Sequence, residues 1–165
     1  MDKDALRALQ APLKARYRED PAAAHLTLRA SGFLGEGVTC KVTTGQALAE
    51  AGLHPATGGS GLELCSGDML LEALVACAGV TLKAVATAIG VDIQEGQVEA
   101  EGDLDFRGTL GVERDAPVGF VSIRLKFHLK TLASEDELAS LLKLTERYCV
   151  VYQTLRGVPV SAEIA

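Results

Sequence analysis

One segment, Met69–Ile89 (MLLEALVACAGVTLKAVATAI), constrains the fold of this chain more than any other. Its apolar residues cover almost the whole surface of a helix, and they are interrupted at Glu72, Thr81, Lys83 and Thr87. A helix that is apolar on every side is buried in the centre of a domain or beneath a partner subunit. The segment therefore predicts a long central helix around which the rest of the chain packs.

Residues typical of helix ends flank this segment on both sides. Ser66 is suited to the N-cap, and Asp68 places a carboxylate in the first turn, where it interacts favourably with the helix dipole. Gly90 is the residue type that commonly ends a helix in a left-handed conformation. The central helix is therefore expected to begin just after Ser66 and to end before Gly90.

The composition is that of a well-packed globular protein. With 165 residues, of which 48% are hydrophobic, we expect a single domain over residues 1–165 with a substantial core. A net charge of −6 argues against a nucleic-acid binder, which must neutralise many phosphates. No uninterrupted run of 18 apolar residues occurs, so no membrane partner is expected. The charged segment Met1–Asp20 is unlike a secretory signal, which predicts a cytoplasmic protein.

Hydrophobic periodicity divides the rest of the chain into helices and strands. Helical spacing predicts an extra N-terminal helix over residues 5–17 and a second long helix over residues 138–155, which the capping box of Ser134 and Glu137 opens. Alternating apolar residues predict strands over residues 25–30, 38–42, 98–106, 121–129 and 158–164. Residues 43–66 are expected to form a long irregular loop. The order predicts an α+β fold with a mainly antiparallel sheet packed on the central helix.

Two of the predicted strands carry opposite charges on one face. Acidic residues alternate along the first strand, most simply as a solvated face: Glu99, Glu101, Asp103 and Asp105. Basic residues alternate along the second: Arg124, Lys126 and His128. If the two strands pair as an antiparallel hairpin, cross-strand ion pairs help to fix the register.

Cys77 and Cys149 are the main candidate functional residues, because each lies in a long helical segment of a small chain. A thiol on a buried helix is most often a small packing residue, and this interpretation applies to both. The alternative is a pair that meets in the fold and cycles between dithiol and disulfide. A nucleophilic Cys77 needs a lowered pKa, which a nearby cation or a helix N-terminus supplies. Lys83 lies about 120° round the helix from Cys77, so any activating cation must come from elsewhere.

Leu138, Leu142 and Thr145 share a helical stripe with Cys149, so Cys149 is expected to face inward.

The other two cysteines give weaker indications. Cys40 lies on the inward face of a predicted strand and is expected in the core. Cys65, in the loop before the central helix, is a lesser redox candidate on grounds of exposure. Zinc would require closely spaced ligand pairs, which are absent, so no metal is expected.

The segments around the two cysteines resemble the OsmC/Ohr family of thiol-dependent hydroperoxide reductases. The segment Ser66–Cys77 (SGDMLLEALVAC) is similar to the family's central helix with its first cysteine. The segment Glu146–Val151 (ERYCVV) is similar to that of the second cysteine. The predicted strand pair and terminal strand fit the same layout, so the resemblance extends over residues 24–165.

This resemblance implies a peroxidase that forms an intertwined homodimer and needs no cofactor. Cys77 would react with the peroxide, Cys149 would resolve the resulting sulfenic acid as a disulfide, and Asp68 would take a supporting acidic position. Organic hydroperoxides would be preferred over hydrogen peroxide, and a dithiol of the lipoyl type or a small thiol would restore the enzyme. The role would be antioxidant, in the oxidative stress response.

A second hypothesis comes from a different functional class. The same dimer could bind a small apolar ligand without catalysis, with both cysteines serving as packing residues. Titration of thiols before and after addition of an organic hydroperoxide separates the two hypotheses.

Overall fold

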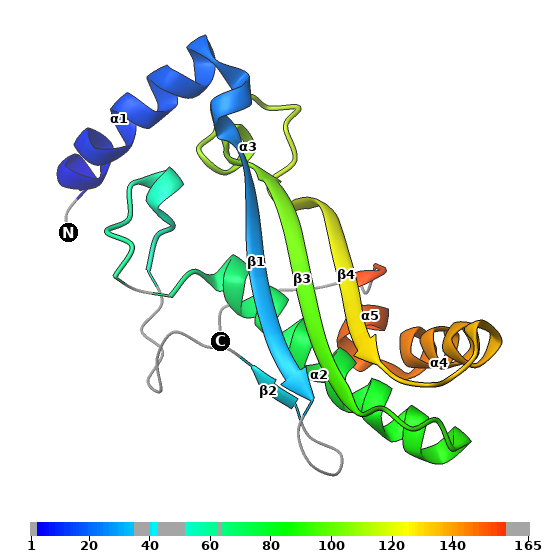
Figure 1. Cartoon of the computed structure of the whole chain (residues 1–165). Helices are drawn as coiled ribbons and strands as arrows, with labels where there is room; N and C mark the ends of the chain where they lie inside the picture. The colour runs from blue at the N-terminus through cyan, green and yellow to red at the C-terminus, as the bar shows by residue number, and fades with distance from the viewer. Residues whose placement is uncertain (1–2, 35–39, 43–51, 63, 158–165) are drawn as a thin grey trace, which may run out of the picture. The chain divides into compact units, whose positions relative to one another are not determined.

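The computed structural model describes residues 3–34, 40–42, 52–62 and 64–157 (Figure 1). Its elements are, in chain order, α1 (Lys3–Glu19), the 3-10 turn η1 (Pro21–Ala24), β1 (His25–Leu34), β2 (Cys40–Val42), the 3-10 turn η2 (Pro55–Thr57), α2 (Ser66–Ile89), β3 (Glu95–Asp105), α3 (Phe106–Thr109), β4 (Phe120–Lys130), α4 (Glu135–Tyr148) and α5 (Val150–Leu155). The order confirms the predicted α+β fold. The strand predicted over residues 158–164 lies outside the described residues.

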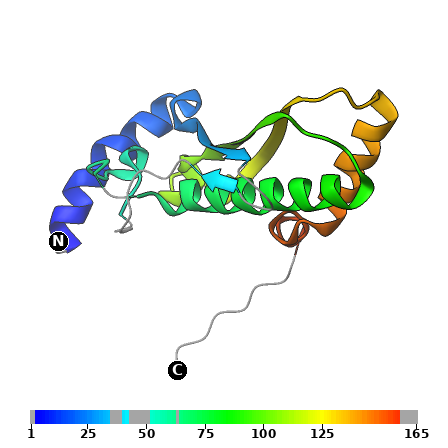
Figure 2. The ribbon, with the colours of Figure 1, turned by 60° about the horizontal axis from the view of Figure 1, so that its bottom comes forward.

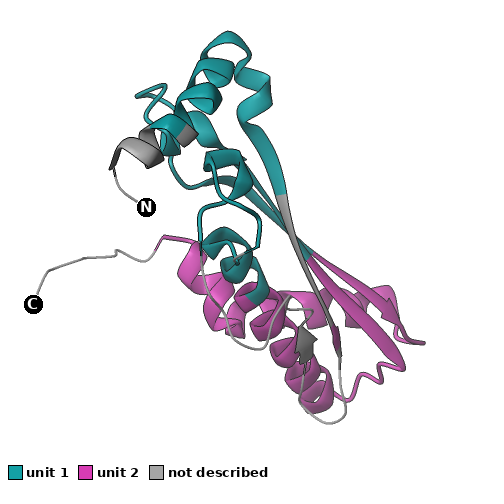
Figure 3. Cartoon of the chain, turned by 90° about the vertical axis from the view of Figure 1, so that its left-hand side faces the viewer, with its two compact units in different colours: residues 1–30, 43–72, 100–125 teal, residues 31–42, 73–99, 126–165 magenta. Residues whose placement is uncertain are grey.

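The chain divides into two compact units (Figure 3). The first contains residues 1–30, 43–72 and 100–125, and the second contains residues 31–42, 73–99 and 126–165. Because α2, β1, β3 and β4 each cross a boundary, every one of these long elements contributes to both units. The single domain over residues 1–165 stays a prediction.

The strands form one four-stranded sheet in the order β2-β1-β3-β4. β1 and β2 pair antiparallel, with Phe33 opposite Lys41. β1 runs four residues beyond the predicted end at Ala30, because its last residues pair with β2. The loop predicted over residues 43–66 contains η2 within its described part.

The predicted charge pairing of β3 with β4 is confirmed in each unit. In the first unit, Arg124 contacts both Glu101 and Asp103. In the second unit, His128 Nε2 lies 3.2 Å from Glu99 Oε2, and Lys130 Nζ, which the prediction did not include, lies 2.7 Å from Glu95 Oε1. The residue numbers of these pairs rise on one strand as they fall on the other, which is the pattern of an antiparallel pair.

Asp105, the last residue of β3, corrects the prediction that the acidic residues form a solvated face. Its side chain is buried, at 3% exposure, and it caps α3 by accepting a hydrogen bond from the Arg107 backbone N–H. The Arg107 guanidinium also pairs with the carboxylate at 2.5 Å, and His25 Nε2 lies 3.3 Å away. A buried carboxylate requires such partners, and alternation along a strand does not reveal them.

The long helix α2 is present as predicted, but its start differs. The helix begins at Ser66, and the Met69 N–H bonds to the carbonyl of Cys65, so Ser66 lies inside the helix and is not its N-cap. At the other end, Gly90 takes a left-handed φ of +77°, as predicted. By length and mean hydropathy, 1.8, α2 could also cross a membrane, but the core helix of a globular protein has the same signature.

In the second unit, α2 packs against the sheet and α4 (Figure 2). Leu82, Val85 and Ala86 of α2 form a core with Leu141 of α4, and Phe127 of β4 packs against it. Burying such side chains supplies about 1.5–3 kcal/mol each, which fixes α4 against α2. This packing positions the segment that follows α4, where Cys149 lies.

Candidate functional site

Cys77 and Cys149 are neighbours in the second unit, although they come from distant parts of the chain. Cys77 lies on α2 and is partly exposed, whereas Cys149 lies between α4 and α5 and is 1% exposed. The two thiols shift each other's pKa values: hydrogen bonding with Cys149 lowers the pKa of Cys77, and the same contact raises that of Cys149. Cys149 therefore faces inward, as predicted.

The backbone breaks at Cys149, which corrects the prediction of a continuous helix over residues 138–155. Cys149 takes extended dihedral angles, φ −72° and ψ 108°, so α4 ends at Tyr148 and α5 begins at Val150. The predicted stripe is also wrong at one position, because Leu142 is 43% exposed and Leu141 occupies the core instead. The capping box of Ser134 and Glu137 at the start of α4 is confirmed.

The break gives Cys149 a structural role as the N-cap of α5. Its Sγ accepts a hydrogen bond from the Tyr152 backbone N–H at 3.5 Å. The first N–H groups of a helix have no partner inside the helix. At α5, the break leaves the N–H groups of Val150 and Val151 free to donate elsewhere, and both donate to Cys77.

The pKa of Cys77 is lowered, although burial opposes this. Burial acts to raise the pKa, because a thiolate is less well solvated inside the protein. Hydrogen bonds from the Val151 N–H, the Cys149 thiol, the Val150 N–H and the Thr81 side chain more than offset it. Within the described residues, the groups that lower this pKa are neutral donors and not a cation, and two of them are N–H groups at the start of α5.

The pKa of Cys149 moves in the opposite direction, to about 11. Burial is the main cause, and donation of the thiol proton to Cys77 adds to it, while the Tyr152 N–H acts to lower the value. The two pKa values therefore move apart: that of Cys77 is lowered, whereas Cys149 keeps its proton at neutral pH. A nucleophile beside a proton-bearing thiol is the arrangement that two-cysteine redox chemistry requires.

Thr81 and the two N–H groups are the functional groups that sequence reasoning missed. Thr81 was detectable, because it lies four residues after Cys77 and so on the same face of α2. The N–H groups of Val150 and Val151 were not detectable, because the periodicity of residues 138–155 indicated an unbroken helix. A helix interior would have used both groups in its own hydrogen bonds.

The other candidates are not part of this pair. Asp68 lies in the first unit, in the first turn of α2, where burial raises its pKa and His54 opposes that effect. Cys65 is partly buried in the same unit. The Cys40 side chain lies outside the described residues. Among the residues that the structure describes, no group of three or more histidine, cysteine or acidic side chains could hold a metal ion.

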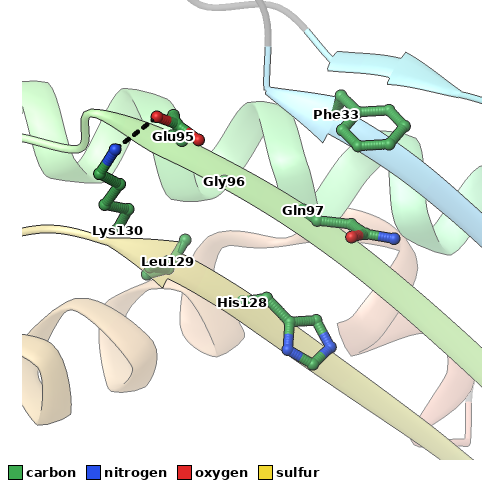
Figure 4. A pocket seen from close by; sticks show the side chains of 7 residues that line it. All are labelled: Phe33, Glu95, Gly96, Gln97, His128, Leu129 and Lys130. Atoms are coloured by element: carbon green, nitrogen blue, oxygen red, sulfur yellow. Dashed lines mark hydrogen bonds and ion pairs between the residues drawn. The ribbon is translucent and has the colours of Figure 1, made fainter.

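A hollow of about 340 Å³ lies on the sheet in the second unit (Figure 4). Its polar lining residues are already partnered: Lys130 with Glu95, and His128 Nε2 at 3.2 Å from Glu99 Oε2. Phe33 contributes a half-exposed ring, and no cysteine lines the hollow. The Lys130 and His128 side chains of the hollow therefore already have partners among the described residues.

Comparison with known proteins supports the arrangement of the fold. The family model described as OsmC-like protein matches residues 58–163. A crystal structure of an OsmC-like protein from Mycoplasma pneumoniae is similar, with a TM-score of 0.56, 19% identity, and coverage of 81% of this chain and 86% of that one. So is an OsmC-like hydroperoxide resistance protein from a Jannaschia species, with a TM-score of 0.61, 15% identity, and coverage of 84% and 91%. No curated protein shows significant sequence similarity.

Proposed function

Because the chain belongs to the OsmC-like family, we propose that it is a cysteine-based peroxidase that reduces organic hydroperoxides in defence against oxidative stress. The observation that carries this proposal is the hydrogen-bonded pair of Cys77 and Cys149, whose pKa values move in opposite directions. The similar protein from Jannaschia is described as a hydroperoxide resistance protein, which supports the same substrate class.

The first step is attack of the Cys77 thiolate on the distal peroxide oxygen. The O–O bond breaks, the alkoxide takes up a proton and leaves as the alcohol, and Cys77 becomes a sulfenic acid. The thiolate is the reacting species, so the donors from Thr81, Val150 and Val151 favour this step by stabilising it. The same donors hold the Cys77 sulfur in a fixed position at the start of α5.

The second step joins the two sulfur atoms. The Cys149 sulfur attacks the sulfenic sulfur, the S–O bond breaks, and water leaves with the thiol proton. Cys149 then gives up its role as hydrogen-bond acceptor for the Tyr152 N–H. An external dithiol, of the lipoyl type or a small thiol, restores both cysteines by two exchange reactions and leaves as its own disulfide.

We propose that the active unit is a cytoplasmic homodimer. Val80 and Ile89 of α2 are exposed in the second unit, and Met69 and Leu70 of α2 are exposed in the first. Exposed apolar side chains on a helix with so little polar surface support burial against a second subunit. Light scattering on the purified protein tests this and should give twice the mass of the chain, 17.3 kDa.

Thiol titration with cumene hydroperoxide tests the peroxidase proposal directly. One equivalent should consume two thiols per chain in the wild type and none in Cys77→Ser. Cys149→Ser should lose one thiol, and its sulfenic acid should be trapped by dimedone at Cys77. Mass spectrometry of the wild type should locate the disulfide between Cys77 and Cys149.

Cys65→Ser is the matched control, because Cys65 is a partly buried thiol that lies outside the pair. It should oxidise at the wild-type rate. Retention of all wild-type thiols after prolonged exposure would exclude the peroxidase. The non-enzymatic ligand-binding dimer would then be the better hypothesis.

A further inference from the structure

A cavity of about 390 Å³ lies in the first unit, and its lining shares no residue with the thiol pair. Most of its wall is apolar, with Leu70 from α2, Leu104 from β3, and the rings of Phe106 and Phe120. Cavities that hold small organic molecules in proteins have this size and this predominantly apolar lining.

One wall of the cavity is held in place by the N-terminal helix. The Tyr17 hydroxyl of α1 donates to the Ala56 carbonyl at 2.6 Å, and Tyr17 itself is buried. The Gln10 side-chain amide donates to the neighbouring Thr57 carbonyl at 3.3 Å. The turn η2 is therefore fixed, and the cavity is formed before any ligand arrives, which lowers the entropic cost of binding.

His54 lines this apolar cavity and brings a polar ring to it. Its Nδ1 accepts a hydrogen bond from the Ala56 N–H at 3.0 Å, so the neutral ring carries its proton on Nε2. The ring is stacked on Phe106, with centroids 5.0 Å apart and planes 17° apart, which fixes its orientation. These contacts with described residues leave Nε2 unused, and burial lowers the pKa of the ring and so favours the neutral form.

We propose that this cavity binds a small uncharged organic molecule with a compact apolar body and one acceptor oxygen, such as an aromatic alcohol, which accepts a hydrogen bond from His54 Nε2. A charged ligand is disfavoured, because the apolar wall would desolvate it. An anion would also be repelled by Asp68, which interacts electrostatically with His54. Leu53 and Val118 line the cavity and stay 43% and 66% exposed, so a ligand has apolar surface to cover.

Fluorine NMR with three matched probes tests the proposal on the full-length protein. The resonance of 4-fluorobenzyl alcohol should broaden and saturate at one site per chain. 4-Fluorotoluene, which lacks the oxygen, should bind more weakly, and 4-fluorobenzoate should not bind. Because Cys77 and Cys149 are not involved, Cys77→Ser should bind the alcohol as the wild type does, so this result is independent of the peroxidase proposal.

Two variants assign the binding to the cavity. His54→Asn keeps an N-cap acceptor for η2 but removes Nε2. It should weaken binding of the alcohol about two- to tenfold and leave 4-fluorotoluene unchanged. Gly119→Leu places a side chain at a lining position where an added Cβ meets no atom within 4 Å, and it should abolish binding of both probes.

Thermal unfolding confirms first that each variant is folded. The proposal is wrong if the wild type shows no saturable binding, or if Gly119→Leu binds the alcohol as the wild type does. It is also wrong if His54→Asn weakens the binding of both probes equally, since the ring would then contribute by packing and not by a hydrogen bond. If the wild type binds no probe and Gly119→Leu has a smaller mass by light scattering, the cavity receives a second copy of the chain.

Discussion

The thiol pair in the second unit and the His54 cavity in the first unit both contain titratable groups that are at least partly buried. Their pKa values are nevertheless shifted in different ways. Burial moves both His54 and Cys149 towards their neutral forms, lowering the pKa of one and raising that of the other. Cys77 is partly buried, but hydrogen-bond donors reverse the effect of burial and lower its pKa. Burial alone therefore gives a neutral group, and a reactive thiolate requires donors directed at the sulfur.

The largest expected effect comes from removing two of these donors together. In Thr81→Val with Val150→Pro, the Cys77 pKa should rise, because each donor to a charged group contributes about 1.5–3 kcal/mol. A thiolate whose pKa is higher is intrinsically more nucleophilic, and this offsets about half of the fall in rate that the smaller thiolate population causes. The rate constant for peroxide reduction at pH 6 should fall about tenfold to a hundredfold, as measured by stopped flow. An unchanged rate would show that these donors do not activate Cys77.

Val150→Pro alone isolates one backbone donor. Proline is favoured at the first position of a helix, and the extended Cys149 before it is compatible with proline. The variant removes the N–H without disturbing α5, and the rate at pH 6 should fall about threefold to tenfold. Val150→Ala keeps the N–H and is the control, for which we expect the wild-type pH profile. Equal losses in both variants would attribute the effect to packing.

Cys149 should make the second unit sensitive to alkali. Its pKa in the folded chain is raised to about 11, above that of an unfolded cysteine, about 8.5. The unfolded chain therefore loses this proton first, and the stabilisation present below about pH 8.5 is lost as the pH rises towards 11. In urea unfolding from pH 7 to 10, the free energy of unfolding should decrease less in Cys149→Ser than in the wild type. Identical pH dependence in both proteins would contradict a raised pKa of Cys149 in the folded chain.

His54 should make the first unit sensitive to acid, with a smaller effect because the ring is partly exposed. Its pKa in the folded chain lies below that of an unfolded histidine, about 6.5. The unfolded chain therefore binds the proton first, and the free energy of unfolding should decrease as the pH falls below 6.5. In His54→Asn this decrease should be smaller between pH 7 and pH 5. A steeper decrease in the variant would mean that the fold favours the charged ring.

Local sequence signals determined most of the elements, whereas the two cysteines were assigned as site residues on the resemblance to a known family. Apolar periodicity predicted α2, the capping box predicted the start of α4, and alternating charges predicted the pairing of β3 with β4. These features depend on residues that are close in sequence or that repeat regularly, so they can be predicted without the contacts between distant segments.

The tertiary structure decided what surrounds Cys77 and His54. Packing of Leu141 on α2 positions the break at Cys149, and the break frees the N–H groups that lower the pKa of Cys77. Contacts from α1 fix η2, whose N-cap residue His54 lines the cavity. Sequence patterns give the periodicity of burial, but hydrogen bonds between distant segments depend on the packed arrangement, so periodicity cannot predict them.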